Sequence, residues 1–456
     1  MDEHILNTVF DQPNSPLATP YLRGLFQVVQ QQRVEFILAR TNRRQKRRGR
    51  LLASSTVWLV VAMALFATHS IPKVWRSLHP YTTIPDPDES TFTKARHRLG
   101  VTPMRELFHD VAPALAAPGT PGVFYRSWRL MGIDGTTFDM PDTPDNDRIF
   151  GRGGNQRSPN AFPHVRVMAL CELGTHAIID FALRPIQHGE QTMVPRLTRS
   201  LQPGMLLLWD RNFYGFDLIQ SVLDRDAHLL ARVKTSQLIF ERIQNLSDGS
   251  YLSCIYPSFA DRRAKRHGRI VRIIEYTHND PNRKGCGERH RLLTDLLDPD
   301  DLPALEAPLV YHQRWEEELV FDEIKTHLNG RPVKLRSKTP RGVVQELYGL
   351  MLAHRILRQV MADAAQQDKP IEATRLSFTD SLRILQSHLH EAPACDPATW
   401  YQRVQEEVRR QRLRPRRNRW YPRVIKRKMK KWNRKRACHA KPTQPTKAFD
   451  ESIVII

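Results

Sequence analysis

Two apolar segments that each end in an aspartate restrict the fold of this chain more than any other feature of its sequence. The segment LMGI is followed by Asp134, and the segment MLLLW is followed by Asp210. Short apolar runs of this kind are typical of buried strands, and a carboxylate at the end of such a strand is held rigidly at a sheet edge. If the two strands lie side by side, both carboxylates face one metal site. Taken singly, either aspartate is more often a strand terminator or a turn residue.

A third carboxylate, Glu318, lies in residues 311–328, which we predict to be a helix. Tyr311, Arg314, Glu318 and Lys325 follow one another at intervals of three, four and seven residues. At about 100° per residue, all four project from one helix face. The alternative is a solvated face held by ion pairs, but Glu318 and Lys325 are about 10 Å apart along the axis, too far for the usual i,i+4 pair. A functional strip explains the pattern better.

The charge of the chain favours a polyanionic partner. Its 456 residues are enough for two to four folded units, and its formal net charge is +22. Such a field suits DNA, RNA or an acidic membrane surface. From Arg409 to Lys441 there are seventeen Lys or Arg residues and no Asp or Glu, with Trp420, Tyr421 and Trp432 interleaved. This stretch is either an arm that follows phosphates and stacks on bases or a disordered basic tail without dedicated contacts.

Cysteine usage and hydropathy argue against a secreted or membrane protein. The five cysteines are scattered and form no CxxC pair, so we expect free thiols in a reducing cytoplasm rather than a disulfide framework or a zinc ribbon. Residues 1–10 lack the apolar run of a secretory signal. The wholly apolar run from Val57 to Ala67 would span only about 16 Å as a helix, roughly half of a bilayer core. We therefore expect a buried helix of a soluble domain there.

The sequence pattern changes from helical to strand-like partway along the chain. Residues 1–120 look mostly helical, and their short basic segment STFTKARHRLG either enters a DNA groove or forms a solvated helix face. A boundary rich in Pro and Gly follows at residues 116–123. FPHVRVMALCEL and THAIIDFALRPI then look like a hairpin joined at Gly174-Thr175, and residues 236–305 contain short β-like stretches.

These features come together in a resemblance to the transposases of the insertion-sequence-4 family. Tyr311-x2-Arg314-x3-Glu318-x6-Lys325 is the signature of that family, and the segment YHQRWEEELVFDEIK matches it at every position. DGTTFDMPDTPDN and LLLWDRNFYGF are similar to the segments that hold the family's first and second aspartates. TVWLVVAMALF together with STFTKARHRLG resembles its N-terminal domain, and RWYPRVIKRKMKKW resembles its basic C-terminal stretch. The resemblance covers roughly residues 20–435.

The resemblance implies an α/β fold with a ribonuclease-H-like catalytic core. An all-α N-terminal domain would precede the core, a β-rich insertion would interrupt it, and a basic tail would follow it. The longer gap along the chain lies between the second aspartate and the glutamate, which leaves room for the insertion. The expected parts are residues 1–120 for the helical DNA-binding domain, 121–235 and 306–400 for the core, 236–305 for the insertion and 401–456 for the tail.

A member of this family is a DDE transposase, named after two aspartates and one glutamate. Asp134, Asp210 and Glu318 would be its catalytic residues and the ligands of two Mg²⁺ ions, which Mn²⁺ could replace. They would serve phosphodiester hydrolysis at the element ends and strand transfer. The resemblance assigns contacts with DNA phosphates to three further residues, Tyr311, Arg314 and Lys325.

The implied partners are the terminal inverted repeats of the mobile element and target DNA. Because synapsis of two DNA ends usually needs two protomers, we expect a homodimer on DNA. We expect it in a bacterial cytoplasm, associated with the nucleoid and without membrane contact. Three alternatives stay open: an inactive relative that binds DNA without cutting it, a host nuclease or resolvase with the same core, and a membrane protein.

Some members of the family release their element through a DNA hairpin, and a tryptophan of the β insertion then stacks on a flipped base. This chain has no tryptophan between Trp209 and Trp315. The position expected for the stacking residue holds His290, and the other aromatic residues of the insertion are Phe240, Tyr251, Tyr256, Phe259 and Tyr276. We predict that hairpin formation is weak, absent or dependent on a different residue.

Overall fold

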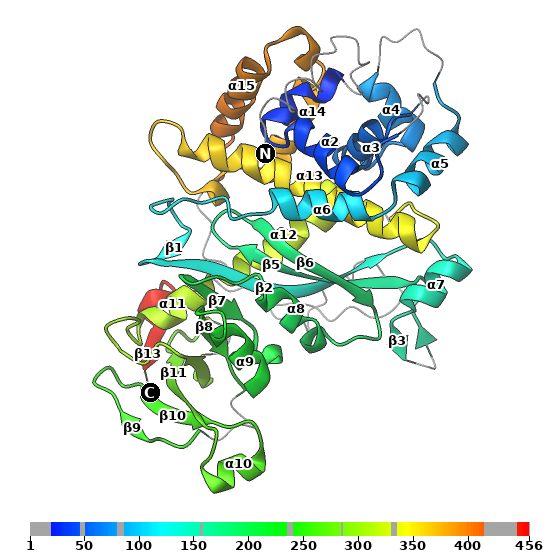
Figure 1. Cartoon of the computed structure of the whole chain (residues 1–456). Coiled ribbons are helices and arrows are strands. Elements are labelled where there is room, and N and C mark those ends of the chain that lie inside the picture. Colours follow the sequence, from blue (N-terminus) through cyan, green and yellow to red (C-terminus); the bar gives the residue numbers. More distant parts are fainter. Residues whose placement is uncertain are drawn as a thin grey trace, which may run out of the picture.

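Helices from residues 20–111 and 340–410 form one layer, and a large sheet lies beside it (Figure 1). The computed structural model describes residues 20–45, 51–79, 86–155, 158–234, 240–283, 286–329, 335–414 and 445–455. The helical layer consists of η1 (Pro20–Gln27), α2 (Gln31–Arg40), α3 (Ala53–Leu65), α4 (Ile71–Leu78), α5 (Glu89–Leu99), α6 (Thr102–Val111), α13 (Pro340–Gln366), α14 (Phe378–His388) and α15 (Pro397–Arg410). Short 3-10 turns, η5 (Ala373–Arg375) and η6 (Ala392–Ala394), connect the last of these helices.

Helix α3 lies at the centre of the helical layer because it is apolar on nearly every side. Its residues from Ser54 to Leu65 are all buried, and α2, α4, α5 and α13 surround it. A helix of this composition is stable in water only when other elements cover all of its faces. The buried helix that we expected at residues 57–67 is therefore confirmed. No helix among the described residues is long and apolar enough to cross a membrane.

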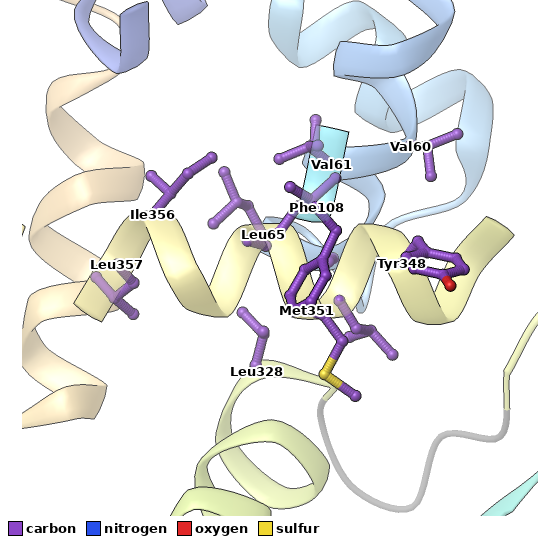
Figure 2. Packing of buried hydrophobic residues seen from close by; sticks show 14 of the residues in the cluster. Val60, Val61, Leu65, Phe108, Leu328, Tyr348, Met351, Ile356 and Leu357 are labelled. Carbon is purple, nitrogen blue, oxygen red and sulfur yellow. The ribbon is translucent and has the colours of Figure 1, made fainter. Parts of the chain in front are cut away.

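The contact between α3 and α13 is close enough to require a glycine. A Cβ atom at position 349 would lie 2.6 Å from the carbonyl oxygen of Val60, so Gly349 lets the two helix backbones approach each other. Figure 2 shows the apolar side chains that gather around this contact, among them Val61, Phe108 and Met351. The N-terminal helices and α13 therefore share one core.

Helix α5 corresponds to the basic segment STFTKARHRLG, and one of its cations is buried. Phe92, Ala95 and Leu99 point into the core, as their spacing indicates. Arg96 is buried as well, and its Nη2 donates a hydrogen bond of 2.8 Å to Oγ of Ser337. The local pattern alone would place Arg96 on the outer face of this helix. Its contact with the segment before α13 arises from tertiary packing, which that pattern does not encode.

The sheet is built around β2 (Trp128–Asp139), in the strand order β6-β5-β2-β7-β8-β12-β11-β10-β9. β5 (His164–Glu172) runs antiparallel to β2, and β6 (Ala177–Pro185) runs antiparallel to β5. The predicted hairpin is thus confirmed. On the other side, β7 (Met205–Trp209) is parallel to β2, and β8 (His228–Arg232) is parallel to β7.

Short strands complete the sheet and its margins. β1 pairs with β2 and β13 pairs with β11, whereas β3 and β4 form a separate two-stranded ribbon. The bounds are β1 (Phe124–Tyr125), β3 (Gly154–Asn155), β4 (Ser158–Pro159), β9 (Gln244–Asn245), β10 (Tyr251–Ile255), β11 (Arg269–His278), β12 (His290–Thr294) and β13 (Ile453–Ile455).

Helices cover both faces of the central strands. On one face, α8 and α9 pack against Met131 and Ile133 of β2. On the other face, α12 lies against β2, and its Val320 and Phe321 join the core of the helical layer. The elements concerned are α7 (Pro144–Phe150), η2 (Glu190–Thr192), α8 (Val194–Thr198), η3 (Arg211–Phe213), α9 (Phe216–Leu223), α11 (Glu306–His312) and α12 (Trp315–Asp322).

The segment 311–328, which we predicted to be one helix, consists of three pieces. α11 ends at His312, α12 begins at Trp315, and a π-helical turn, η4, runs from Glu323 to Leu328. The prediction of one continuous helix is therefore wrong, although nearly all of the segment is helical. π-helical turns are rare and often occur at functional sites, where tertiary contacts hold the wider turn in place.

Residues 236–305 extend the central sheet, since β12, β11, β10 and β9 continue from β8. Within this segment His290 is buried in β12, whereas Phe259 at the start of α10 (Phe259–Ala264) is 82% exposed. The region 401–456 is folded at both of its ends, because α15 reaches Arg410 and β13, which follows η7 (Asp450–Ser452), pairs with β11. The basic stretch at 415–444 lies outside the described residues.

Candidate active site

The two strand-end aspartates lie on neighbouring parallel strands. Ile133 of β2 is paired with Trp209 of β7, so Asp134 and Asp210 occupy the next position on each strand. Adjacent strands are about 4.8 Å apart, which brings the two carboxylates to one place on the sheet. β7 ends at Trp209 whereas β2 continues past Asp134, so the site lies where the parallel pairing stops.

Each aspartate is oriented by a backbone amide next to it. Oδ1 of Asp134 accepts a hydrogen bond of 2.8 Å from the amide of Gly135, and Oδ1 of Asp210 accepts one of 2.6 Å from the amide of Arg211. Burial raises the pKa of Asp134 to about 6, while Gly135 and Arg314 act to lower it. Both side chains are half-buried, so they remain accessible to a ligand.

Arg314 connects the first aspartate with the glutamate of α12. Its Nη1 lies 3.8 Å from Oδ2 of Asp134, and its Nη2 lies 3.4 Å from Oε1 of Glu318. The guanidinium group therefore occupies the space between these two carboxylates. Among the residues that the structure describes, no three His, Cys, Asp or Glu side chains are close enough together to hold a metal ion as they stand. Arg314 lies between two of the acids, Asp134 and Glu318.

The two other residues of the signature lie near this group. Nζ of Lys325 donates a hydrogen bond of 3.1 Å to Oγ1 of Thr136, two residues beyond Asp134 on β2, and burial lowers the pKa of Lys325. Tyr311 is buried at the end of α11, and burial raises the pKa of its hydroxyl well above the usual range. The break between α11 and α12 does not separate Tyr311 from the site, because Arg314 and Asp210 are among the charges that act on it.

The structure places two further acidic residues near Asp134 that were not predicted from the sequence. Glu190 in η2 binds Arg166 at 2.6 Å and lies beside Gly135, and nothing in its local sequence marks it. Glu317 is fully buried above Gly132 of β2, and neither of its carboxyl oxygens has a hydrogen-bond partner of normal geometry. Burial, followed by the charge of Asp134, raises the pKa of Glu317 well above its usual range. The sequence carries a signal for Glu317, since it occupies a position of the apolar stripe formed with Val320, Phe321 and Ile324.

A buried ionic network holds the π-helical turn that follows α12. Arg358 and His354 of α13 bind the carboxylate of Glu323 at 2.9 and 3.0 Å, and His176, in the turn just before β6, binds it at 2.7 Å. The second ring nitrogen of His176 lies 2.9 Å from Glu316 of α12. Although burial acts to raise the pKa of Glu323, Arg358 and His176 hold it well below its usual range. The network fixes α12 and η4, and with them Glu318 and Lys325, relative to the sheet.

The combination of a mixed sheet, paired strand-end aspartates and a helix-borne glutamate is accompanied by two family matches. Residues 129–356 match the family model described as the transposase DDE domain, and residues 21–109 match the N-terminal region of insertion element 4 transposases. These matches define the class, a DDE transposase that cleaves DNA and transfers its strands. Because the domain model covers half of the chain and the N-terminal model precedes it, the chain belongs to the insertion element 4 family of these transposases.

Two bacterial transposases and one solved structure are similar to this chain. The chain is 28% identical over 422 residues to the transposase InsG of insertion sequence element IS4 from Escherichia coli K12, a match that covers 88% of this chain and 89% of that protein. It is 25% identical over 217 residues to the putative transposase InsZ of the same strain, covering 47% of this chain and 72% of InsZ. Among solved structures, the piggyBac transposase in a synaptic complex with hairpin DNA superposes with a TM-score of 0.41 at 12% identity, covering 86% of this chain and 82% of that one.

Proposed function

We propose that this transposase acts on the ends of its mobile element with divalent metal ions bound by Asp134, Asp210 and Glu318. The observation that carries the proposal is the parallel register of β2 and β7, which sets Asp134 beside Asp210, together with the Arg314 link to Glu318. All three residues offer carboxylate oxygens, the hard ligands that Mg²⁺ and Mn²⁺ prefer. We therefore propose two Mg²⁺ ions, for which Mn²⁺ can substitute.

The strand order supports a ribonuclease-H-like core. β6, β5 and β2 form an antiparallel unit, and β7 and β8 continue the sheet in parallel with β2. We propose residues 121–235 and 306–400 as the two parts of this core and residues 236–305 as its insertion. Residues 1–120 would then be the helical DNA-binding domain, and 401–456 a basic extension whose two ends are folded.

The proposed mechanism assigns a task to each side chain of the site. When bound, the metal ions supply Lewis acidity to an in-line displacement at the scissile phosphodiester. The carboxylates of Asp134 and Asp210 are held in place by the sheet and by backbone amides, so little reorganisation opposes ligand binding. Once Asp134 and Glu318 bind metal ions, the guanidinium group of Arg314 can bind two phosphate oxygens at once. Lys325 can bind a phosphate through its single positive charge. The hydroxyl of Tyr311 stays protonated at neutral pH and can donate a hydrogen bond to a phosphate.

The charge of the chain supports DNA as the partner. We propose that residues 1–115 recognise the terminal inverted repeats and that the basic stretch from Arg409 to Lys441 adds affinity for any DNA, target DNA included. Synapsis of two ends would require two protomers on DNA. The site of action would be the nucleoid in the bacterial cytoplasm.

The proposal is tested by replacing each carboxylate with its amide. Asp134→Asn, Asp210→Asn and Glu318→Gln should each reduce Mg²⁺-dependent cleavage of labelled element ends by at least about a thousandfold while DNA binding in a mobility-shift assay is retained. Asp322→Asn is the matched control, because this partly exposed carboxylate of α12 lies 3.2 Å from His327 and is not one of the three proposed ligands. Cleavage that persists in any of the three variants would remove that residue from the site. Wild-type protein that binds the ends but never cleaves them with either ion would be an inactive relative.

A further inference from the structure

We propose that Glu317 is a fourth acidic residue of the metal site, which gains its missing partner when a divalent cation binds beside Asp134. The inference rests on the proposed function, because it adds a residue to the same site. It starts from the carboxyl group itself, which is completely buried and has no hydrogen-bond partner of normal geometry on either oxygen. Proteins rarely leave a buried carboxyl in this state, because the lost hydration is not replaced.

Elsewhere in this protein, buried carboxylates are supplied with partners. Glu323, only six residues further along, binds Arg358, His354 and His176. Glu172 at the end of β5 accepts hydrogen bonds from Arg129, from Thr175 and from backbone amides. The fold therefore satisfies buried acids where they serve its structure, and Glu317 is an exception that calls for a ligand.

The sheet makes room for Glu317 at a cost to its own packing. A Cβ atom at position 132 would lie 2.7 Å from Oε2 of Glu317 and 2.7 Å from a methyl group of Leu173, so Gly132 leaves the space that the carboxyl occupies. A glycine inside a strand weakens that strand, because its backbone loses more conformational entropy on folding and it offers no side chain to pack. Gly132 gives up packing in β2 and leaves room for Glu317. A binding role for Glu317 explains this arrangement better than a structural role does.

The carboxyl group of Glu317 lies beside the part of β2 that carries Asp134. Gly132 and Asp134 are two residues apart on β2 and so present the same face of the sheet to α12. Among the charges that act on the Glu317 carboxyl, that of Asp134 is the strongest, Arg314 opposes it and Glu318 adds to it. The backbone amide of Asp134 is also near enough to act on the same carboxyl. Both terminal nitrogens of Arg314 already lie against Asp134 and Glu318. A divalent cation beside these acids would give the Glu317 oxygens a partner that no side chain among the described residues supplies.

The test measures metal binding in the full-length protein without DNA. Mn²⁺ affinity, followed by electron paramagnetic resonance, should fall about 10- to 100-fold in Glu317→Gln, the loss typical of a residue that supports a metal site. Glu317→Met keeps the length of the side chain and removes its polar atoms. It should raise the melting temperature of the metal-free protein and reduce the further rise that Mn²⁺ causes. Asp322→Asn, on the same helix but in contact with His327, should bind Mn²⁺ like the wild type.

The possible results separate this inference from the proposed function. If Asp134→Asn and Glu318→Gln lose Mn²⁺ binding while both Glu317 variants keep wild-type affinity, Glu317 is only a neutral core residue and the inference is wrong. If Asp134→Asn and Glu318→Gln also bind Mn²⁺ like the wild type, the proposed metal site itself is wrong. A Glu317→Met variant that is less stable without metal than the wild type would assign the carboxyl a structural role and would likewise overturn the inference.

Discussion

Arg314 is a counter-ion to Asp134 and Glu318. In the proposed mechanism these two carboxylates bind metal ions at one site. The guanidinium of Arg314 lies within 4 Å of Asp134 and Glu318, and Asp210 and Glu317 are among the other charges that act on it. A cation in this place lowers the repulsion among the acids in the absence of metal. It also competes with any metal ion for the same oxygens, because both are attracted by the same negative charge.

We expect Arg314→Gln to bind Mn²⁺ more tightly than the wild type in the absence of DNA, by about tenfold, which corresponds to about 1.4 kcal/mol. The reason is that the substitution removes the positive charge that opposes the metal at Asp134 and Glu318. Isothermal titration calorimetry measures the change, with Lys325→Gln as the control, since Lys325 contacts Thr136 and forms no ion pair with either acid among the described contacts. Cleavage should nevertheless decrease in Arg314→Gln because the substrate phosphate loses its guanidinium partner. Weaker Mn²⁺ binding in this variant would mean that Arg314 organises the carboxylates instead of competing for them.

The last described strand, β13, attaches residues 449–455 to the sheet at β11. β13 pairs with β11, and Nδ1 of His278 on β11 lies 3.0 Å from Oγ of Ser452. Phe449 stacks on His312 of α11 at a ring distance of 4.3 Å and also contacts His278. This segment therefore connects β11 with the helix that leads to Tyr311.

Docking of this C-terminal segment should weaken as the pH falls. Burial, followed by the charges of His290, Arg283, His312 and Arg232, lowers the pKa of His278 from its ordinary value of 6.5 to about 4. Between these two pH values His278 binds a proton when the segment is undocked but not when it is docked. The contribution of His278 to docking is therefore complete above pH 6.5 and is lost as the pH falls toward 4.

Hydrogen exchange of the amides in residues 449–455, corrected for intrinsic rates, should be at most roughly thirtyfold faster at pH 5 than at pH 7.5. His278→Gln retains a hydrogen-bonding group for Ser452 but does not titrate, so its corrected exchange should vary much less with pH. Equal acceleration in both proteins would show that another group is responsible.

At the scale of the whole molecule, the net charge of +22 is concentrated in a basic stretch that begins within a folded helix. Arg409 of α15 donates hydrogen bonds to carbonyl oxygens of Ala364, Ala365 and Lys369, so it is part of the folded structure. Deletion of all residues after 408 would remove these hydrogen bonds and β13 as well. The contribution of the basic stretch to DNA binding is better measured by neutralising its charges.

Replacing the Lys and Arg residues between 416 and 436 by Gln should lower the affinity for element ends and for random DNA by the same factor. It should also flatten the salt dependence of binding, by about 0.9 in the log–log slope for each DNA phosphate that the variant no longer neutralises. Fluorescence anisotropy over a range of salt concentrations measures both quantities. If the variant instead lost only its preference for element ends, end recognition would lie in this stretch and not in residues 1–115.

Local sequence patterns are sufficient to predict the features that depend on near neighbours. The apolar runs before Asp134 and Asp210 are strands, the segments on either side of Gly174 form the β5–β6 hairpin, and the run that starts at Val57 is a buried helix. The side-chain periodicity and the length of these elements are local properties, so the sequence alone is enough to predict the elements.

The tertiary structure alone decided which of these elements meet and what each buried charge faces. The parallel pairing that sets Asp134 beside Asp210, the break before Trp315 and the pairing of β13 with β11 all depend on residues distant in the sequence. The contrast between Glu317 and Glu323 has the same origin. Both are acids buried on consecutive turns, but only Glu323 meets Arg358, because the free energy of a buried charge depends on partners that the fold brings to it from elsewhere in the chain.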